Sequence, residues 1–213
     1  AAGKSAKFVP HPLYDNFGEK ISKEAARKEL GIGKDEKILL FFGFIRNYKG
    51  LDILLDAMKL LKLKSQTSNI KLLIAGEFYE DRKAYDDQIK QSGIADSLIL
   101  KTDFIPDSEV KYYLCAADVV VQPYRSATQS GVTPLAYHFE VPMIVTNVGG
   151  LPSLVPDGKV GLIAEPDAES IAAKIIEYFD KGAETFLPHL KEEKKKYSWS
   201  KMTAAILDVA NSK

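Results

Sequence analysis

Short apolar runs alternate with longer amphipathic segments along most of this chain, and that alternation limits its fold more strongly than any other feature. The apolar runs are continuous rather than alternating, which is the pattern of strands covered on both faces. They span residues 37–43, 70–76, 98–102, 118–123, 142–146 and 160–164. Helical segments are predicted between or after them at residues 51–62, 81–93, 108–117, 131–139 and 166–179. This strand–helix order predicts right-handed crossovers and one parallel, doubly wound α/β sheet.

The two ends of the chain differ from this pattern. Two further helices are predicted at residues 183–199 and 200–213, whereas residues 9–18 contain two prolines and no regular period. Capping residues mark three of the predicted helix ends, with N-caps at Ser108 and Asp167 and a C-terminal cap at Gly93.

The charge balance and the single cysteine exclude several classes of protein. Lysine plus arginine and aspartate plus glutamate both total 29, so the net charge is zero, which argues against a nucleic-acid partner. Cys115 stands alone, so no internal disulfide can form, and a reducing, cytoplasmic compartment fits best. No apolar run approaches the roughly 20 residues of a membrane span. The three histidines and Cys115 share no metal-ligand spacing, so no metal site is expected.

Two cations follow the first predicted strand. In "FFGFIRNYKG" (41–50) the apolar run ends at Gly43, and Arg46 and Lys49 precede a helix that starts near Gly50. Ligands of an open parallel sheet bind beyond the carboxyl ends of the strands, so both cations lie on the binding edge. A helix N-terminus favours an anion, and an arginine with a lysine suits a diphosphate better than a single carboxylate. The alternative is a pair of exposed surface cations.

Two later loops carry further signals. Residues 123–137, "PYRSATQSGVTPLAY", place small and hydroxylated residues before Gly131, where backbone N–H groups can hold an oxyanion or a sugar hydroxyl. The same pattern fits a serine-capped helix. Residues 146–158, "TNVGGLPSLVPDG", contain paired glycines that allow close approach to a neighbour or a ligand, or form a simple turn. The fingerprint G-x-G-x-x-G follows no predicted strand and no G-x-S-x-G elbow occurs, which argues against nicotinamide or flavin enzymes and against hydrolases.

Taken together and in this order, the motifs resemble the C-terminal half of a family 4 (group 1) glycosyltransferase of GT-B architecture. The segments that carry the resemblance are "FFGFIRNYKGLDILLDAM", "LLIAGEFY", "AADVVVQPY", "TQSGVTPLAY", "PMIVTNVGGLPSLVPDGKVGLIAEP" and "YSW". They stand in register over nearly the whole chain.

The resemblance implies a Rossmann-like sheet that forms one half of a GT-B fold, with C-terminal helices. In that family the C-terminal domain binds the nucleotide-sugar donor and an N-terminal domain binds the acceptor. Residues 1–30 are then expected to form a linker and entry segment, and residues 31–184 the nucleotide-sugar-binding domain. Residues 185–213 would be helices that pack towards an N-terminal domain absent from this chain. The chain is expected to be part of a longer protein and inactive when isolated.

The resemblance also implies site residues. Arg46 and Lys49 resemble the catalytic pair that contacts the donor diphosphate, and Gly43 permits close approach of their loop. Phe104 and Ile105 resemble the segment that lies against the nucleobase.

The loop after the fourth strand completes the implied donor site. Gln129, Ser130 and Gly131 fall where the family loop meets the donor sugar and phosphates. Glu77, just past the second strand, is interpreted as a solvated loop charge rather than a site residue. GT-B enzymes are expected to work without a metal or another cofactor, and the same is expected here.

The sequence departs from the family pattern at its acidic positions. The family has two glutamates eight positions apart, which fall here on Ala127 and Leu135, or on Thr128 and Ala136 with a one-residue gap. Ser153 stands where the family commonly has another glutamate. Donor contacts are therefore expected to use neutral side chains and backbone N–H groups.

The leading prediction is a glycosyltransferase donor domain that binds a nucleotide diphosphate sugar for retaining transfer of a hexosyl group to a hydroxyl acceptor in glycan or glycoconjugate synthesis. Its expected partners are that donor and a glycan, lipid or small-molecule acceptor held by the N-terminal domain. Peripheral membrane association of the full-length protein is compatible with this role. The alternative is a non-catalytic nucleotide- or protein-binding module of the same fold, which the missing glutamates suggest. An epimerase or phosphorylase of similar fold ranks last, since no acid and base pair is evident.

Overall fold

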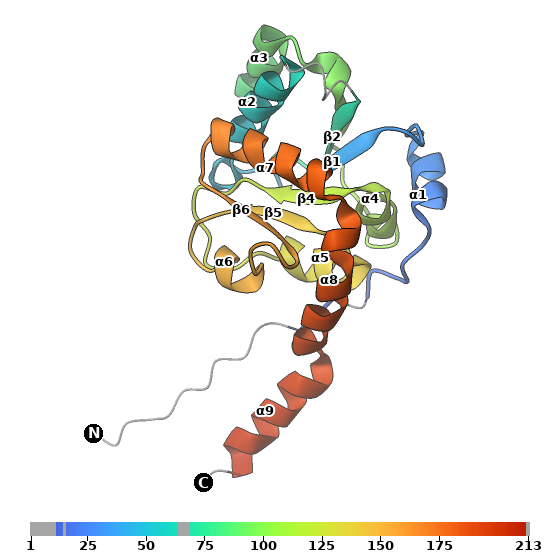
Figure 1. The fold of residues 1–213 in the computed structure, drawn as a ribbon, viewed down its shortest axis with the longest axis vertical. Helices are drawn as coiled ribbons and strands as arrows, with labels where there is room; N and C mark the ends of the chain where they lie inside the picture. Colours follow the sequence, from blue (N-terminus) through green and yellow to red (C-terminus); the bar gives the residue numbers. More distant parts are fainter. Residues whose placement is uncertain (1–11, 15, 64–68, 212–213) are drawn as a thin grey trace, which may run out of the picture.

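The described part of the chain contains one sheet of six parallel strands (Figure 1). The computed structural model describes residues 12–14, 16–63 and 69–211, so predictions for residues 1–11, 15 and 212–213 lie outside it. The strands are β1 (Lys37–Phe42), β2 (Ile70–Ala75), β3 (Leu98–Lys101), β4 (Val119–Gln122), β5 (Met143–Thr146) and β6 (Gly161–Ala164). Their order in the sheet is β3-β2-β1-β4-β5-β6. This order reverses direction between β1 and β4, as in a Rossmann-like fold, and the predicted fold class is confirmed.

Helices cover both faces of the sheet. The α-helices are α1 (Lys23–Leu30), α2 (Leu51–Lys62), α3 (Lys83–Ser92), α4 (Val110–Ala116), α5 (Val132–Phe139), α6 (Leu151–Leu154), α7 (Ala168–Lys181), α8 (Leu187–Lys194) and α9 (Trp199–Asn211). Helix α2 packs against α3 and α7, whereas α4 packs against α1 and α5, and α5 packs against α8. The strands and the five predicted helices between or after them begin and end within two residues of the positions expected from the sequence.

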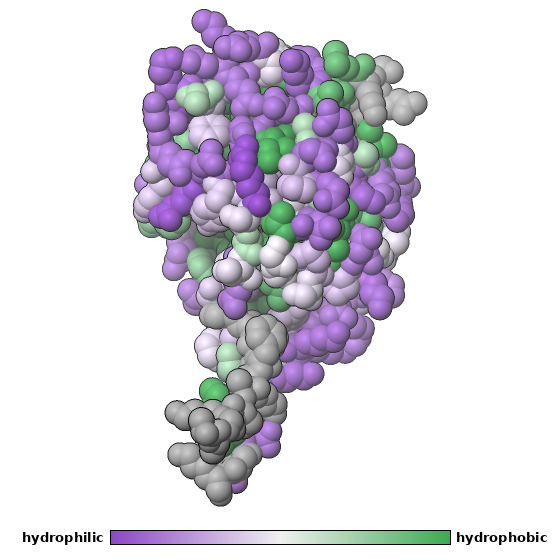
Figure 2. Space-filling view, turned by 90° about the vertical axis from the view of Figure 1, so that its left-hand side faces the viewer, coloured by the Kyte–Doolittle hydropathy of each residue, from purple (hydrophilic) through white to green (hydrophobic). Residues whose placement is uncertain are grey.

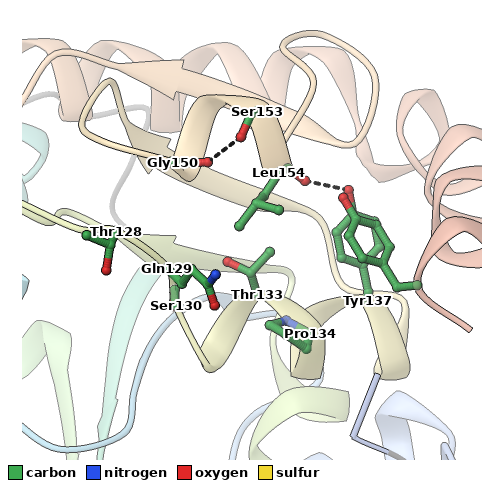
Figure 3. A pocket seen from close by; sticks show the side chains of 10 residues that line it. Thr128, Gln129, Ser130, Thr133, Pro134, Tyr137, Gly150, Ser153 and Leu154 are labelled. Atoms are coloured by element: carbon green, nitrogen blue, oxygen red, sulfur yellow. Dashed lines mark hydrogen bonds between the residues drawn. The ribbon is translucent and has the colours of Figure 1, made fainter. Parts of the chain in front are cut away.

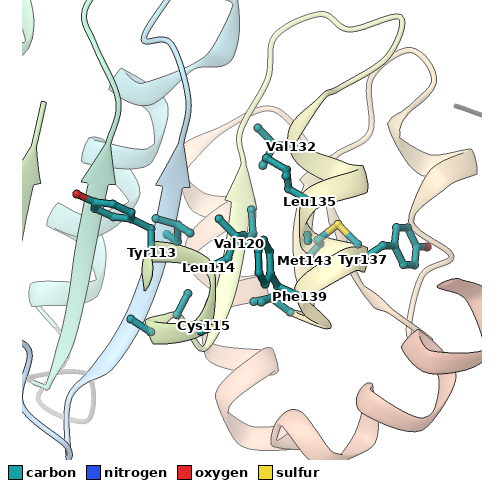
Figure 4. Close-up of a cluster of buried hydrophobic side chains, with 14 of the residues drawn as sticks. Tyr113, Leu114, Cys115, Val120, Val132, Leu135, Tyr137, Phe139 and Met143 are labelled. Carbon is teal, nitrogen blue, oxygen red and sulfur yellow. The ribbon is translucent and has the colours of Figure 1, made fainter. Parts of the chain in front are cut away.

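Side chains along each strand alternate between two hydrophobic cores, because successive residues of a strand point to opposite faces. In β1, Leu39 and Phe41 belong to the core with α2 and α7, and Ile38 and Leu40 belong to the core with α4 and α5. These four side chains are at most 1% exposed. Figure 4 shows the second of these cores, where α4 and α5 pack on the sheet. Burial on both faces explains why the strands read as continuous apolar runs.

Two of the three predicted helix caps are present. The Asp167 carboxylate accepts a 2.7 Å hydrogen bond from the Ser170 N–H, and Gly93 ends α3 in the left-handed conformation, with φ 66°. The prediction that Ser108 caps α4 is wrong. The Glu109 N–H donates to the Pro106 carbonyl at 2.9 Å, so residues 106–109 form a turn and the helix begins only at Val110.

Helix α1 was not predicted from the sequence, which gave residues 1–30 as a linker and entry segment. It packs against α4 through a polar contact that lies among buried residues. The Arg27 guanidinium binds the Asp118 carboxylate at 2.9 Å, the Ala116 carbonyl at 3.1 Å and the Lys34 carbonyl at 2.7 Å. The same Asp118 oxygen accepts the Ile38 N–H at 2.6 Å, so the contact joins α1 to the start of β1.

We predict that Arg27→Met lowers the free energy of unfolding by about 2–3 kcal/mol. The substitution leaves two carbonyls and a partly buried carboxylate without their guanidinium partner, and broken networks of this kind cost several kcal/mol. Urea unfolding followed by circular dichroism measures the change. Lys28→Met, on the exposed side of α1, is the matched control and should alter stability by less than about 0.5 kcal/mol. Equal stability of the two variants would contradict the role given to Arg27.

Helix α8 packs on α5, whereas the last helix, α9, leaves the body of the domain (Figure 1). No residue of α9 is buried, and Ile206, Leu207 and Val209 are each more than half exposed. At its N-terminal end the Trp199 indole N–H donates to the Leu13 carbonyl at 3.1 Å. Among the described residues no helix combines the length and the apolar character needed to cross a membrane.

Candidate functional site

A pocket of about 360 Å³ lies at the carboxyl ends of β1, β2 and β4, where the strand order reverses. Ligands of doubly wound sheets bind at this point. Seven of the eight predicted site residues line the pocket: Gly43, Lys49, Phe104, Ile105, Gln129, Ser130 and Gly131. Figure 2 shows this side of the molecule, with several hydrophobic residues in the middle of a mainly hydrophilic face. The structure therefore brings together loops that are far apart in the sequence.

Two glycines allow the loops after β1 and β2 to pass close to each other. Gly43 and Gly76 have φ values of 88° and 135°, and a Cβ on Gly76 would lie 2.5 Å from the Gly43 carbonyl oxygen. Beyond this crossing, the Ile45 N–H donates to the Glu77 carbonyl at 2.7 Å, and the Tyr79 N–H donates to the Ile45 carbonyl at 3.1 Å. At Gly43 the close neighbour in the structure is the loop after β2, and its expected approach to a ligand stays a prediction.

Lys49 is the buried cation of the pocket. It ends the short 3₁₀ helix η1 (Asn47–Lys49) and is only 8% exposed. Burial, and after it the nearby charge of Arg46, lowers the pKa of Lys49 to about 8. Among the described carboxylates, none forms an ion pair with its ammonium group, and its aromatic neighbour is Tyr124, whose ring centroid lies 5.9 Å away. A buried ammonium without a counter-ion is suited to an anionic ligand, because such a charge is costly unless paired.

Arg46 lies outside the pocket lining and is exposed to solvent. The central carbon of its guanidinium group is 5.0 Å from the centroid of the Tyr79 ring, which itself packs against Phe44. Two cations that look alike in the sequence are thus placed differently: Lys49 inside the pocket and Arg46 at its outer edge.

Ser130 connects the loop after β4 to the start of α5. Its hydroxyl oxygen accepts a hydrogen bond from the Val132 N–H at 3.1 Å and lies 3.2 Å from the Tyr124 hydroxyl. Burial raises the pKa of Tyr124, so its hydroxyl keeps its proton. The serine side chain therefore supports the helix start, while Gly131 and Val132 present the N-terminal end of α5 to the pocket.

The paired glycines bring a third loop against this segment. A Cβ on Gly149 would lie 1.6 Å from the Ala127 carbonyl oxygen, and one on Gly150 would lie 2.5 Å from the Thr128 carbonyl oxygen. A second pocket of about 230 Å³ lies between residues 128–130, α5 and α6 (Figure 3). Its lining holds hydroxyl and amide groups but no aspartate, glutamate, lysine, arginine or histidine. Both interpretations of the glycine pair are confirmed: residues 149–150 form a turn before α6, and they pass close to the neighbouring backbone.

The carboxylates of the main pocket come from residues that sequence reasoning did not select as site residues. Helix α5 supplies Leu135 rather than an acid, whereas Glu77 and Asp107 both line the pocket. Glu77, interpreted from the sequence as a solvated loop charge, is partly exposed and belongs to the pocket lining. Both acids follow a strand end closely, and that position was the available signal. In the described part of the chain no group of three or more metal-binding side chains is placed to hold a metal ion.

The doubly wound sheet defines a Rossmann-like domain, and the cation-bearing pocket lies at its reversal point, where ligands of such sheets bind. Comparison with known families is more specific. The model of the family described as glycosyl transferases group 1 matches residues 22–197. The chain belongs to the group 1 glycosyltransferases.

Individual relatives agree with this assignment. The D-inositol 3-phosphate glycosyltransferase of Corynebacterium urealyticum is 26% identical over 213 residues, which cover 97% of this chain and 48% of that protein. Sucrose-phosphate synthase from Thermosynechococcus elongatus superposes with a TM-score of 0.79 at 20% identity, over 96% of this chain and 52% of the other. Anabaena Alr3699/HepE, solved in complex with UDP-glucose, superposes with a TM-score of 0.77 at 19% identity, over 94% of this chain and 56% of the other. The fold is one half of a GT-B glycosyltransferase, and the chain spans at most about half the length of these curated relatives.

Proposed function

We propose that this domain binds the nucleotide diphosphate sugar of a retaining hexosyltransferase. The observation that carries the proposal is the buried Lys49 ammonium, which pairs with none of the described carboxylates, in a pocket at the reversal point of the sheet. The match to group 1 glycosyltransferases and the UDP-glucose complex of the similar Anabaena protein support a uridine diphosphate hexose as the donor.

The lining suggests how such a donor would lie. Phe104 and Ile105 offer apolar surface to the base, and the Glu77 and Asp107 carboxylates can accept hydrogen bonds from ribose hydroxyls. The diphosphate would meet Lys49 and the N-terminal end of α5. The hexose would extend towards the Gln129 side of the pocket, which offers neutral hydrogen-bonding groups.

The chemical difficulty is departure of a diphosphate that gains negative charge as its bond to the anomeric carbon breaks. Lys49 would stabilise this charge from inside the pocket, and Arg46 would add a second positive charge from the loop edge. Preorganised charges of this kind commonly contribute roughly 3–4 kcal/mol to transition-state stabilisation. The two cations would fill the role that a metal ion fills elsewhere, and a base for the acceptor hydroxyl would come from the donor phosphate or from an N-terminal domain.

An acceptor-binding domain would face the exposed C-terminal helix. The apolar side chains Ile206, Leu207 and Val209 of α9 contact little of the described chain and suit packing against another domain. On this proposal the isolated chain binds the donor but does not transfer the sugar.

Thermal unfolding with UDP, GDP and ADP tests the donor site directly. A nucleotide at about one hundred times its dissociation constant should add roughly 2.7 kcal/mol to the free energy of unfolding, which raises Tm by about 5–10 °C. We expect the rise with UDP and its loss in the double variant Arg46→Ala/Lys49→Ala. A stabilising effect that survives in the double variant would contradict the proposed site.

A non-catalytic nucleotide-binding module is the second candidate. The absence of a carboxylate from the part of α5 that lines the pocket favours it. The two candidates separate when the full-length protein is incubated with UDP-glucose. Release of UDP on addition of an acceptor supports the transferase, whereas tight binding with no donor consumed supports the module.

A further inference from the structure

Arg125 lies next to the pocket but turns its charge away from it. One guanidinium nitrogen donates to the Asn47 carbonyl at 2.9 Å and to an Asp52 carboxylate oxygen at 2.7 Å, and the other binds the second Asp52 oxygen. The backbone N–H of Arg125 donates to the Tyr48 carbonyl at 2.8 Å. Arg125 does not line the pocket, and its donors are directed at residues 46–52, the segment that carries both cations.

We call residues 46–50 the cation turn. It is held against the segment after β4 at several points along its length. Besides the two hydrogen bonds that Arg125 donates to the Asn47 and Tyr48 carbonyls, the Cα of Gly50 lies so close to Pro123 that an added Cβ would be 2.0 Å from the Pro123 carbonyl oxygen. Asp52 belongs to the first turn of α2, so its pairing with Arg125 fixes the helix start to the same segment.

We infer that Arg125 is a positioning residue that, paired with Asp52, holds the cation turn so that the Lys49 side chain stays inside the pocket. This inference rests on the proposed function of the pocket as a diphosphate site. An ammonium group prefers water, so a loosened turn would let Lys49 move its charge out to solvent. The Arg125–Asp52 ion pair opposes that movement from outside the pocket.

The Arg125–Asp52 ion pair, which we call the clamp, is partly exposed, so its effect on ligand binding can be measured apart from its effect on folding stability. The side chains of Arg125 and Asp52 are 37% and 35% exposed. Exposed ion pairs contribute little to folding, so removing either partner should lower Tm by no more than about 4 °C. Variants of the clamp are therefore expected to fold and to be measurable in binding experiments.

A direct contact between Arg125 and the diphosphate is the rival explanation, and the two make opposite predictions for Asp52. If Asp52 only withheld a cation from the ligand, Asp52→Asn would leave UDP affinity unchanged or increase it. If the pair positions the turn, Asp52→Asn and Arg125→Gln should each weaken UDP binding about 10–30-fold. The double variant should then be no weaker than the weaker single variant, because both changes break one clamp.

The pH dependence of binding gives a second measurement that a merely weakened fold would not change. The groups around Lys49 that carry or can carry charge are Arg46 and Tyr48 on its own turn, Tyr124 after β4, Glu77 after β2 and Asp107 after β3. In the wild type, UDP affinity should fall as Lys49 loses its proton above pH 8. This lies above the range near pH 6 in which phosphate groups titrate. In Arg125→Gln the pH at which UDP affinity falls by half (the midpoint) should rise, towards the pKa of a solvated lysine near 10.4.

The experiment is calorimetric titration of UDP into the wild type, Arg125→Gln, Asp52→Asn, the double variant and Lys181→Gln, at pH values from 7 to 10. Lys181→Gln removes an exposed cation paired with Glu177 on α7 and is expected to bind UDP like the wild type. Weakened, non-additive binding in both clamp variants with a raised midpoint supports the inference. Wild-type UDP affinity in Arg125→Gln, or stronger UDP binding by Asp52→Asn, would overturn the inference about the clamp and leave the proposed function standing. Failure of the wild type to bind any nucleotide would overturn the proposed function and the inference with it.

Discussion

Replacing Lys49 with methionine is expected to remove most nucleotide binding while making the folded chain more stable. Lys49 is 8% exposed, and its pKa falls from 10.5 to about 8, mainly because of burial. A shift of that size corresponds to roughly 3 kcal/mol of unfolding free energy at neutral pH, so the uncharged variant should gain about 1–3 kcal/mol. On the proposed function the same change removes the charge-assisted hydrogen bonds that Lys49 would make to the diphosphate, which should weaken UDP affinity about 100-fold. Calorimetric titration and urea unfolding of the same preparations measure both effects.

The stability gain should depend on pH in a defined direction. Below pH 8, Lys49 is protonated in both the folded and the unfolded chain, so the whole cost of burying its charge is present. Between pH 8 and 10.5 the unfolded chain still holds a proton that the folded chain has released, so wild-type stability gains a rising contribution from Lys49. The advantage of the methionine variant should shrink through this window and vanish above it.

The control for this prediction is Lys59→Met on the exposed side of α2. It removes a lysine of the neighbouring helix that neither lines the pocket nor is buried, so UDP affinity and stability should stay close to wild type. Normal UDP binding by Lys49→Met would show that the ammonium group has no part in the site.

Most of the fold could be predicted because the strands other than the edge strand β3 are largely buried on both faces. Side chains such as Leu39 and Leu40 face different cores, yet both must be apolar, so the strand appears in the sequence as an unbroken apolar run. Helix α1 shows where this reasoning ends. The place of α1 in the domain depends on the ion pair between Arg27 and Asp118. These two residues are distant in the sequence, and no local sequence pattern predicts that they pair.

The site was predictable to the level of loops but not of side chains. Parallel strands end at one edge of a sheet, so the sequence could indicate that Gly43 and Gly131 would meet around one pocket, and the family resemblance added Phe104. It could not distinguish Lys49, which the η1 turn directs into the pocket, from Arg46 three residues earlier. That difference arises from contacts of the cation turn with the segment after β4, which only the folded chain brings together.

Replacing Gly50 with alanine should destabilise the chain by about 3–5 kcal/mol and disturb the main pocket as well. Gly50 has φ 68°, a conformation that costs an L-residue roughly 1–2 kcal/mol. The larger effect is steric: the new Cβ would lie 2.0 Å from the Pro123 carbonyl oxygen, which belongs to the backbone and can yield only if the turn or the end of β4 moves. Displacements of this kind are among the named causes of large mutational losses. UDP binding should weaken too, because the displaced segment carries Lys49.

Two other glycines separate the steric effect from the backbone effect. Gly31 and Gly93 have nearly the same conformation, with φ 70° and 66°, but a Cβ on either would meet no atom within 4 Å. Gly31→Ala and Gly93→Ala should therefore lose only the roughly 1–2 kcal/mol of the left-handed conformation and should bind UDP like the wild type. Urea unfolding of the three variants measures the difference directly. If Gly50→Ala loses no more than these controls, the contact with Pro123 does not constrain the turn; a larger loss with weakened UDP binding shows that tight packing of the turn maintains both stability and the site.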